Sequence, residues 1–128
     1  MLRNDMACYK ARAEAVRHAE VYRGAFAISV CPSENVESPT IVGAQAANEL
    51  LNIIGIKASF VLTEYNGKIY ISSRSIDEIN VQLIMERLGG GGHLNVAGAQ
   101  LKDCTIVQAK HAIMDTLDEM LKEGDIQE

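Results

Sequence analysis

The amino-acid sequence predicts an α/β domain built on a mixed β-sheet of about four or five strands, with helices packed on it. A nearly continuous apolar segment at residues 24–31 is typical of a strand covered on both faces. The pair Asn66-Gly67, between two segments of strand character, is typical of a tight β-hairpin. Segments with apolar residues at helical spacing alternate with these strands. The chain has 128 residues, of which 48% are hydrophobic, so we expect one domain with a continuous core.

The first half of the chain is expected to alternate helix and strand. Residues 5–20 have the spacing of an amphipathic helix, and its predicted inward face holds Met6, Tyr9, Ala13 and Val16. The strand at residues 24–31 follows, and then a polar loop at residues 32–37. The segment Ser38-Pro39-Thr40 favours the start of a second helix, and Gly55 favours its end. The predicted inward stripe of this second helix consists of Ala47, Leu50, Leu51 and Ile54.

The hairpin and two further helices are expected in the second half. The hairpin strands are predicted at residues 58–64 and 68–73, which places Arg74 at the end of the second strand. Asn80 is a suitable cap for a helix whose apolar residues are Val81, Ile84, Met85 and Leu88. A short helical turn within residues 94–98 and a last strand at residues 99–102 follow.

The final helix is expected to begin with a capping box of Thr105 and Gln108, and residues 124–128 after it are expected to fray. Its predicted buried residues are Ile106, Ala109, Ile113, Leu117 and Met120.

The run Gly89-Gly90-Gly91-Gly92-His93 is the strongest functional signal in the chain. Glycines leave their amide groups accessible to an anion, Arg74 adds a fork of donors suited to phosphate, and His93 adds an imidazole. A structural alternative is that Gly89 ends the preceding helix, which would explain that one glycine. We therefore predict a phosphate site, in which alanine at Gly91 or Gly92 removes binding with only a modest loss of stability.

Composition limits the other functions open to the chain. The net charge of −5 argues against binding to long nucleic acids, whereas one small anionic ligand remains compatible. No apolar stretch approaches a membrane span, and residues 1–5 do not resemble a signal peptide, so we expect a soluble cytosolic domain. The three cysteines, Cys8, Cys31 and Cys104, are interpreted as small buried hydrophobes.

The remaining titratable residues carry weaker signals. His18 and His111 are expected on helix surfaces, and no group of residues has metal-ligand spacing. Asp77 and Glu78 lie close to Arg74 in sequence and either shape the site or are simply solvated.

The segments Ser73-Arg74-Ser75, 79–88 and Gly89–His93 together resemble the DHHA1 domain of the DHH/DHHA1 phosphoesterases. The resemblance covers nearly the whole chain. Residues 79–95 look most like the C-terminal domain of the membrane-anchored cyclic-di-AMP phosphodiesterases, and oligoribonuclease-type members share the glycine-histidine motif. The family usually has two alanines and a glycine after the histidine, where this chain has Val96-Ala97-Gly98.

The resemblance implies that residues 1–128 are a DHHA1-type substrate-binding domain, with residues 1–20 as a lead-in helix. A DHH catalytic domain, which holds two manganese ions in the family, is absent from this chain. The implied substrate-binding residues are Arg74, Gly90, Gly91, Gly92 and His93, with His93 also the candidate catalytic residue. No cofactor or metal site is implied within this chain, and the chain alone is expected to be inactive.

The implied partners are a cyclic dinucleotide or short oligonucleotide and the DHH domain of the same parent protein. The implied location is the cytosol, and whether the parent protein carries a membrane anchor elsewhere stays open. Three functions stay open. The chain is a binding module of a cyclic-dinucleotide phosphodiesterase, a module of an oligoribonuclease or related phosphatase, or a free-standing nucleotide-binding module. The preferred nucleotide and the formation of a homodimer also stay open.

Overall fold

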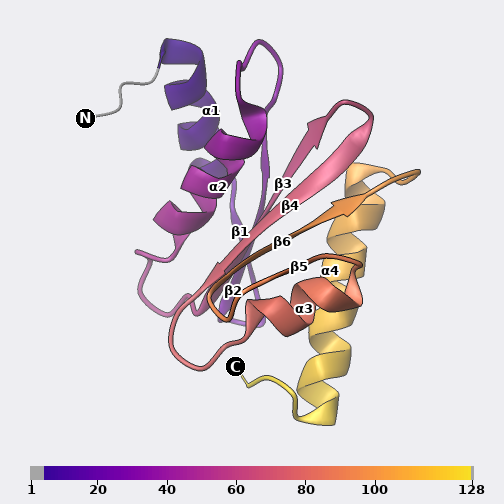
Figure 1. The fold of residues 1–128 in the computed structure, drawn as a ribbon. Helices are drawn as coiled ribbons and strands as arrows, with labels where there is room; N and C mark the ends of the chain where they lie inside the picture. Colours follow the sequence, from indigo (N-terminus) through magenta and orange to yellow (C-terminus); the bar gives the residue numbers. More distant parts are fainter. Residues whose placement is uncertain (1–4, 128) are drawn as a thin grey trace.

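The structure, a computed structural model that describes residues 5–127, contains one mixed sheet of six strands in the order β1-β2-β3-β4-β6-β5 (Figure 1). Strands β2 and β3 are parallel, and the other neighbours in the sheet are antiparallel. The strands are β1 (Glu20–Tyr22), β2 (Phe26–Cys31), β3 (Ala58–Tyr65), β4 (Lys68–Ser75), β5 (Gly91–Gly92) and β6 (Val96–Leu101). The helices are α1 (Met6–Arg17), α2 (Pro39–Leu50), α3 (Val81–Arg87) and α4 (Ile106–Glu123).

Helices cover both faces of this sheet, with α1 and α2 at the left of Figure 1 and α3 and α4 at the right. Each face has its own apolar core. Phe60 and Leu62 of β3 pack on the α3/α4 side, whereas Val61 packs on the α1/α2 side. Ser59 also points toward α2, where its hydroxyl donates to the carbonyl of Ala47 at 2.7 Å. Strand β3 is therefore buried on both sides and forms the centre of the domain.

Local signals in the sequence correctly predicted the hairpin and three helix starts. Asn66 and Gly67 have φ values of 53° and 74°, as a type I′ turn requires. The Asn80 side chain accepts from Leu83 N–H at 3.2 Å and caps α3. Thr105 and Gln108 form the reciprocal capping box of α4. The Ser38-Pro39 segment begins α2, although the Ser38 side chain makes no capping hydrogen bond.

Other expectations about the helices were wrong. In α1, Met6 and Tyr9 are exposed, and the buried residues are Ala11 and Ala15, whose small side chains let the helix lie close to the sheet. Helix α2 ends at Leu50, and Ile54 lies fully exposed beyond it. The part of residues 1–20 that precedes Asp5 lies outside the described residues.

The sheet and the C-terminal segment also differ from expectation. The segment expected to form a helical turn at 94–98 instead contributes the start of β6, and the short strands β1 and β5 bring the number of strands to six. The segment after α4 does not fray over the residues that the structure describes, which end at Gln127. Gly124 caps the helix, Asp125 N–H donates to the Met120 carbonyl at 2.9 Å, and Ile126 is buried against the core.

Within residues 5–127, no helix has the length and apolar character needed to cross a membrane. The three cysteines are free thiols, of which Cys31 is buried and Cys8 and Cys104 are partly buried. Burial raises the pKa of the Cys31 thiol to about 11, which suits the interpretation of this residue as an inert apolar side chain.

Candidate functional site

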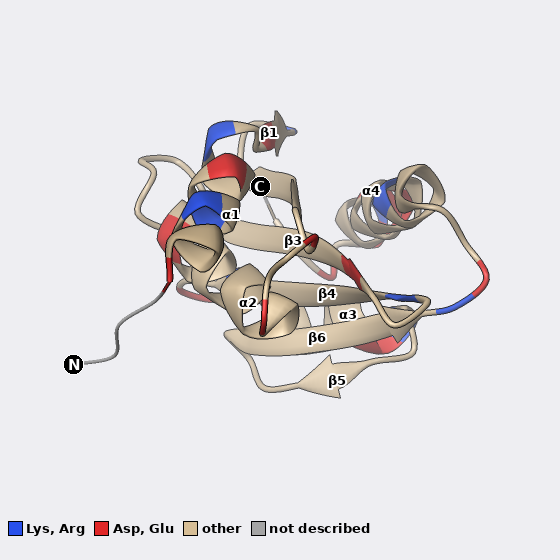
Figure 2. Cartoon of the chain, turned by 90° about the horizontal axis from the view of Figure 1, so that it is seen from above, with Lys and Arg blue, Asp and Glu red and all other residues tan. Residues whose placement is uncertain are grey.

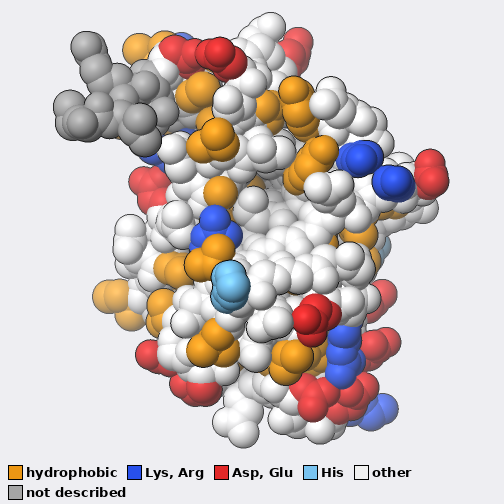
Figure 3. Space-filling view, viewed as in Figure 1, with side chains coloured by type: hydrophobic (Ala, Val, Ile, Leu, Met, Phe, Trp, Pro, Cys, Tyr) orange, Lys and Arg blue, Asp and Glu red, His pale blue; other side chains and the backbone are white. Residues whose placement is uncertain are grey.

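The candidate site is an open groove on the α2 side of strands β4 and β6. Tyr70, Ser72 and Arg74 of β4 face this side, and the residues opposite them on β6 are Gln100, Gly98 and Val96. Helix α2 covers the sheet only as far as β4, which leaves β6 open beside it (Figure 1). The resulting cavity has a volume of about 470 Å³, and Figure 3 shows it as a hollow at the centre of this face.

Arg74 lies at one end of the groove, where its guanidinium is held by two hydrogen bonds. Its Nε donates to Asn48 Oδ1 and its Nη1 donates to the carbonyl of Ser73, both at 2.9 Å. Partial burial lowers the pKa of Arg74, but a guanidinium remains charged at physiological pH. These bonds use two of the five N–H donors, so the rest of the fork is available to a phosphate.

Asn48 is a residue of the candidate site that sequence reasoning missed. It lies on the exposed side of α2, and its contact with Arg74 spans 26 positions along the chain. No local pattern distinguishes it from any other polar residue on a helix surface. We interpret Asn48 as a positioning residue that orients the Arg74 guanidinium.

We expect Asn48→Ala to weaken nucleotide binding by about 0.5–1.5 kcal/mol, because the Arg74 side chain would then have to be ordered by the ligand. Its effect on stability should be small, because Asn48 is exposed. Calorimetric titration of the variant with AMP measures the effect. Asn52→Ala, an exposed asparagine just beyond the same helix, is the matched control. Equal losses in the two variants would contradict the positioning role.

The first two glycines of the run end helix α3. Gly89 N–H donates to the Glu86 carbonyl at 3.1 Å, and Gly90 N–H donates to the Met85 carbonyl at 2.8 Å. With a φ of 85° at Gly89, this arrangement is a Schellman motif. The structural alternative for Gly89 is confirmed and extends to Gly90. The amides of these two residues are therefore engaged within the fold, although both residues line the cavity.

The next residues form the short edge strand β5. Gly91 lies opposite Gly98 and Gly92 lies opposite Ala97, and His93 N–H donates to the Val96 carbonyl at 2.7 Å. Hydrogen-bonded and non-hydrogen-bonded pairs alternate in an antiparallel ladder. The amide of Gly92 is consequently the one in the run that is directed away from β6, toward the open edge of the sheet.

Close packing explains why two of the four glycines have no side chain. A Cβ on Gly90 would lie 2.0 Å from the Gly98 carbonyl oxygen, and a Cβ on Gly92 would lie 2.5 Å from Ala97 Cα. Gly92 also has a φ of 146°, so alanine there would be strained. The expectation of only a modest loss of stability is therefore wrong for Gly92. At Gly91 a Cβ would meet no atom within 4 Å.

Arg74 and His93 are brought into one row across the sheet. Both lie opposite Val96, Arg74 on β4 and His93 at the end of β5, so their backbones are about 10 Å apart. The His93 side chain is exposed. Asn95 fixes the turn that carries it, because its Nδ2 donates to Ser75 Oγ at 2.9 Å and to the Asp77 carbonyl at 3.3 Å. The carboxylates of Asp77 and Glu78 are exposed.

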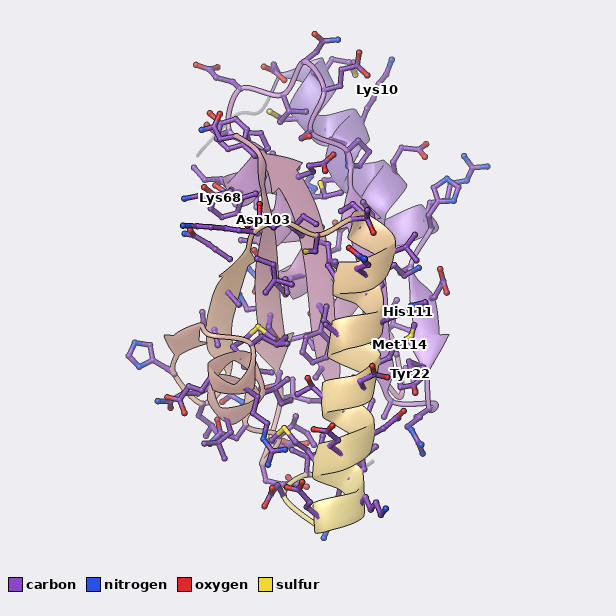
Figure 4. All side chains as sticks on the ribbon, turned by 90° about the vertical axis from the view of Figure 1, so that its right-hand side faces the viewer. Lys10, Tyr22, Lys68, Asp103, His111 and Met114 are labelled. Carbon is purple, nitrogen blue, oxygen red and sulfur yellow. The ribbon has the colours of Figure 1, made fainter. Side chains whose placement is uncertain are left out.

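Within residues 5–127, no group of three or more His, Cys, Asp or Glu side chains is arranged to hold a metal ion. His18 is the exposed C-cap residue of α1, and its Nε2 lies 2.8 Å from a Glu14 carboxylate oxygen. His111 lies on the exposed side of α4, far from the groove (Figure 4). His111 occupies a helix surface, as expected, whereas His18 follows the last residue of α1.

A family model and several known proteins match this chain. The model of the DHHA1 domain matches residues 25–123. The cyclic-di-AMP phosphodiesterase PdeA of Listeria monocytogenes serotype 1/2a (strain 10403S) is 42% identical over 118 residues, which are 91% of this chain and 18% of PdeA. The cyclic-di-AMP phosphodiesterase GdpP of Geobacillus thermodenitrificans (strain NG80-2) is 38% identical over 125 residues, which are 97% of this chain and 19% of GdpP.

Among solved structures, an exopolyphosphatase-related protein from Bacteroides fragilis superposes with a TM-score of 0.80 at 21% identity. The superposition covers 92% of this chain and 36% of that protein, and it shows a shared fold. The chain spans less than a fifth of the length of the two curated relatives.

Proposed function

The chain belongs to the DHHA1 domain family, and from this premise we propose that it is the substrate-binding domain of a phosphodiesterase acting on cyclic dinucleotides, first of all cyclic-di-AMP. The observation that carries the proposal is the position of Arg74. Asn48 holds the Arg74 guanidinium at the end of an open groove. Arg74 lies in the same row across the sheet as His93. An arginine held in this way is suited to a phosphodiester of a small nucleotide. We infer that the domain lies in the cytosol.

In this proposal the chain binds and orients the substrate phosphate. The free N–H groups of Arg74 donate to its non-bridging oxygens, and the outward amide of Gly92 is available as a further donor. Gly91 has no side chain that would keep the phosphate away from the strand. The imidazole of His93 donates to the phosphate and stabilises negative charge on it during transfer. Orientation of the reacting group is the contribution of this domain to catalysis.

The metal ions of the family do not fit this chain, since its described residues offer no ligand cluster. We assign the two manganese ions, and the activation of the attacking water, to a separate DHH domain of the parent protein. The chain alone is therefore a binding module, and no step of the chemistry is assigned to a metal within it.

Two alternatives differ in the ligand. A module of an oligoribonuclease or nucleotide phosphatase would prefer a short linear oligonucleotide or a mononucleotide to cyclic-di-AMP. A free-standing nucleotide-binding module would act without any DHH domain. The proposal favours cyclic dinucleotides because two curated relatives with high coverage of this chain are cyclic-di-AMP phosphodiesterases.

We expect the purified 128-residue chain to bind cyclic-di-AMP in the presence of EDTA, and to show no hydrolysis of it when manganese is added. Calorimetry measures the binding, and chromatography of the nucleotide measures hydrolysis. Titration with the linear dinucleotide and with AMP separates the alternatives by affinity. Robust hydrolysis of cyclic-di-AMP by the rigorously purified chain would contradict the assignment of catalysis to another domain. Absence of binding to every nucleotide would contradict the proposed function.

A further inference from the structure

The cavity extends away from the row that contains Arg74 and His93. Neither residue lines it. It starts at Ser72 and Gly98, one step along the same sheet face from Arg74 and Val96, and continues past Tyr70 and Gln100 to Lys102. A phosphate held by Arg74 and His93 would therefore occupy one end of the groove and leave most of the cavity empty.

Two lysines lie at the far end of the groove. Lys68 is the first residue of β4, and Lys102 directly follows β6. Ile69 pairs with Leu101, so Lys68 and Lys102, one position further along, are neighbours across the two strands. Figure 2 shows blue Lys and Arg positions at this end of β4 and β6, and Figure 4 shows Lys68 extending toward the groove side. Like charges directly across a sheet are destabilising. Within residues 5–127 neither lysine forms an ion pair, which is an arrangement suited to an anion.

Between the two cationic ends, the groove is polar and offers an aromatic surface. Tyr70 is partly exposed, and its ring lies 6.3 Å from that of Tyr65. Thr40, Ser72 and Gln100 add hydroxyl and amide groups to the lining. Among the described residues that line the cavity, none is an aspartate or glutamate. A nucleobase stacks favourably on a tyrosine in such a place.

The length of the groove exceeds what one phosphate needs. Lys68 and Arg74 lie on one face of the same strand, six positions apart, which corresponds to about 20 Å between their Cα atoms. Long side chains at both ends shorten the gap between the charged groups. Once the side chains shorten it, this groove has room for two linked nucleotide units, one nearer Arg74 and one nearer the lysines.

We propose that Lys68, Lys102 and Tyr70 form a second nucleotide subsite, which binds the distal unit of a two-nucleotide substrate whose first phosphate lies at Arg74. The lysines pair with the distal phosphate and Tyr70 stacks on its base. This inference rests on the proposed function, because it assumes a nucleotide phosphate at Arg74. It adds the preference for a dinucleotide over a mononucleotide and names the residues that confer it.

The test compares AMP with the linear 5′-phosphorylated diadenylate as ligands of the 128-residue chain, by calorimetry at low salt. The wild-type chain is expected to bind the diadenylate about tenfold or more tightly than AMP. The Lys68→Gln/Lys102→Gln double variant is expected to lose about tenfold in affinity for the diadenylate and to keep its affinity for AMP. Tyr70→Leu should act in the same direction, while Tyr70→Phe retains the stacking surface.

Lys10→Gln/Lys122→Gln is the matched control, because it makes the same change of charge at two exposed positions far from the groove and should leave both affinities unchanged. Equal wild-type affinity for the two ligands, or an unaltered diadenylate affinity in the groove-lysine variant, would overturn the second subsite while the proposed function stands. Unaltered affinity for both ligands in Arg74→Ala, or no binding by the wild-type chain, would overturn the proposed function itself.

Discussion

Gly90→Ala is expected to lower the free energy of unfolding by about 3 kcal/mol, whereas Gly91→Ala is expected to change it by less than about 0.5 kcal/mol. A Cβ on Gly90 would lie 2.0 Å from the Gly98 carbonyl oxygen and 2.7 Å from Ala99 Cα, and these backbone atoms cannot move without displacing β6. A Cβ on Gly91 meets open space. Urea denaturation followed by circular dichroism measures both changes.

The same pair of variants separates the structural from the functional role of the run. Gly91→Ala should fold normally and bind cyclic-di-AMP more weakly, because Gly91 lies opposite Gly98 on the groove side and its new methyl group would occupy space that the phosphate needs. Gly124→Ala is the control, with a loss of about 1 kcal/mol in stability from its φ of 82° and with binding retained, because Gly124 caps α4 and does not line the cavity. Wild-type stability of Gly90→Ala would contradict the close packing of the run on β6, and wild-type affinity of Gly91→Ala would remove that residue from the site.

The sequence predicted those parts of the fold that carry a local signal. The Asn66-Gly67 turn and the Thr105–Gln108 capping box each fix their own backbone, so they can be read without knowledge of tertiary contacts. The inward face of α1 could not be read in this way. Its large residues Met6 and Tyr9 are exposed, and close packing against the sheet selects the small residues of the helix instead.

The sequence also did not predict the two short strands, β1 and β5. Strand β5 consists of two glycines, and β1 of three residues without apolar alternation, so neither has a periodic pattern. Both form because a neighbouring strand offers unpaired backbone groups, which is a tertiary effect. The expected helical turn after His93 failed for the same reason, since pairing with β4 draws residues from Val96 onward into the sheet.

For the candidate site, the sequence indicated residue types but not their geometry. The run of glycines and Arg74 indicated an anion site, and the fold places Arg74 in one row with His93. The structural role of each glycine in the run depends on the element that it contacts. Two amides cap α3, and two positions lack a side chain because β6 is in contact. The bond from Arg74 to Asn48 joins two elements far apart in the sequence, so only the fold reveals it.

Arg74→Ala is expected to weaken the binding of cyclic-di-AMP to the chain by about 1.5–3 kcal/mol, which is tenfold to more than a hundredfold in dissociation constant. The lost interaction is a charge-assisted hydrogen bond to phosphate in a partly buried place, where solvent screens it less than at the surface. Arg74→Lys should recover part of the affinity, because it restores a point charge without the planar fork that Asn48 orients. Arg17→Ala on α1, which removes the same charge from a side chain that is 74% exposed, is the control and should bind as the wild type does. Calorimetric titration of the three variants, with thermal denaturation to establish that each is folded, measures these differences. Equal affinities in Arg74→Ala and Arg17→Ala would show that only the net charge of the chain matters, and Arg74 would then have no place in the site.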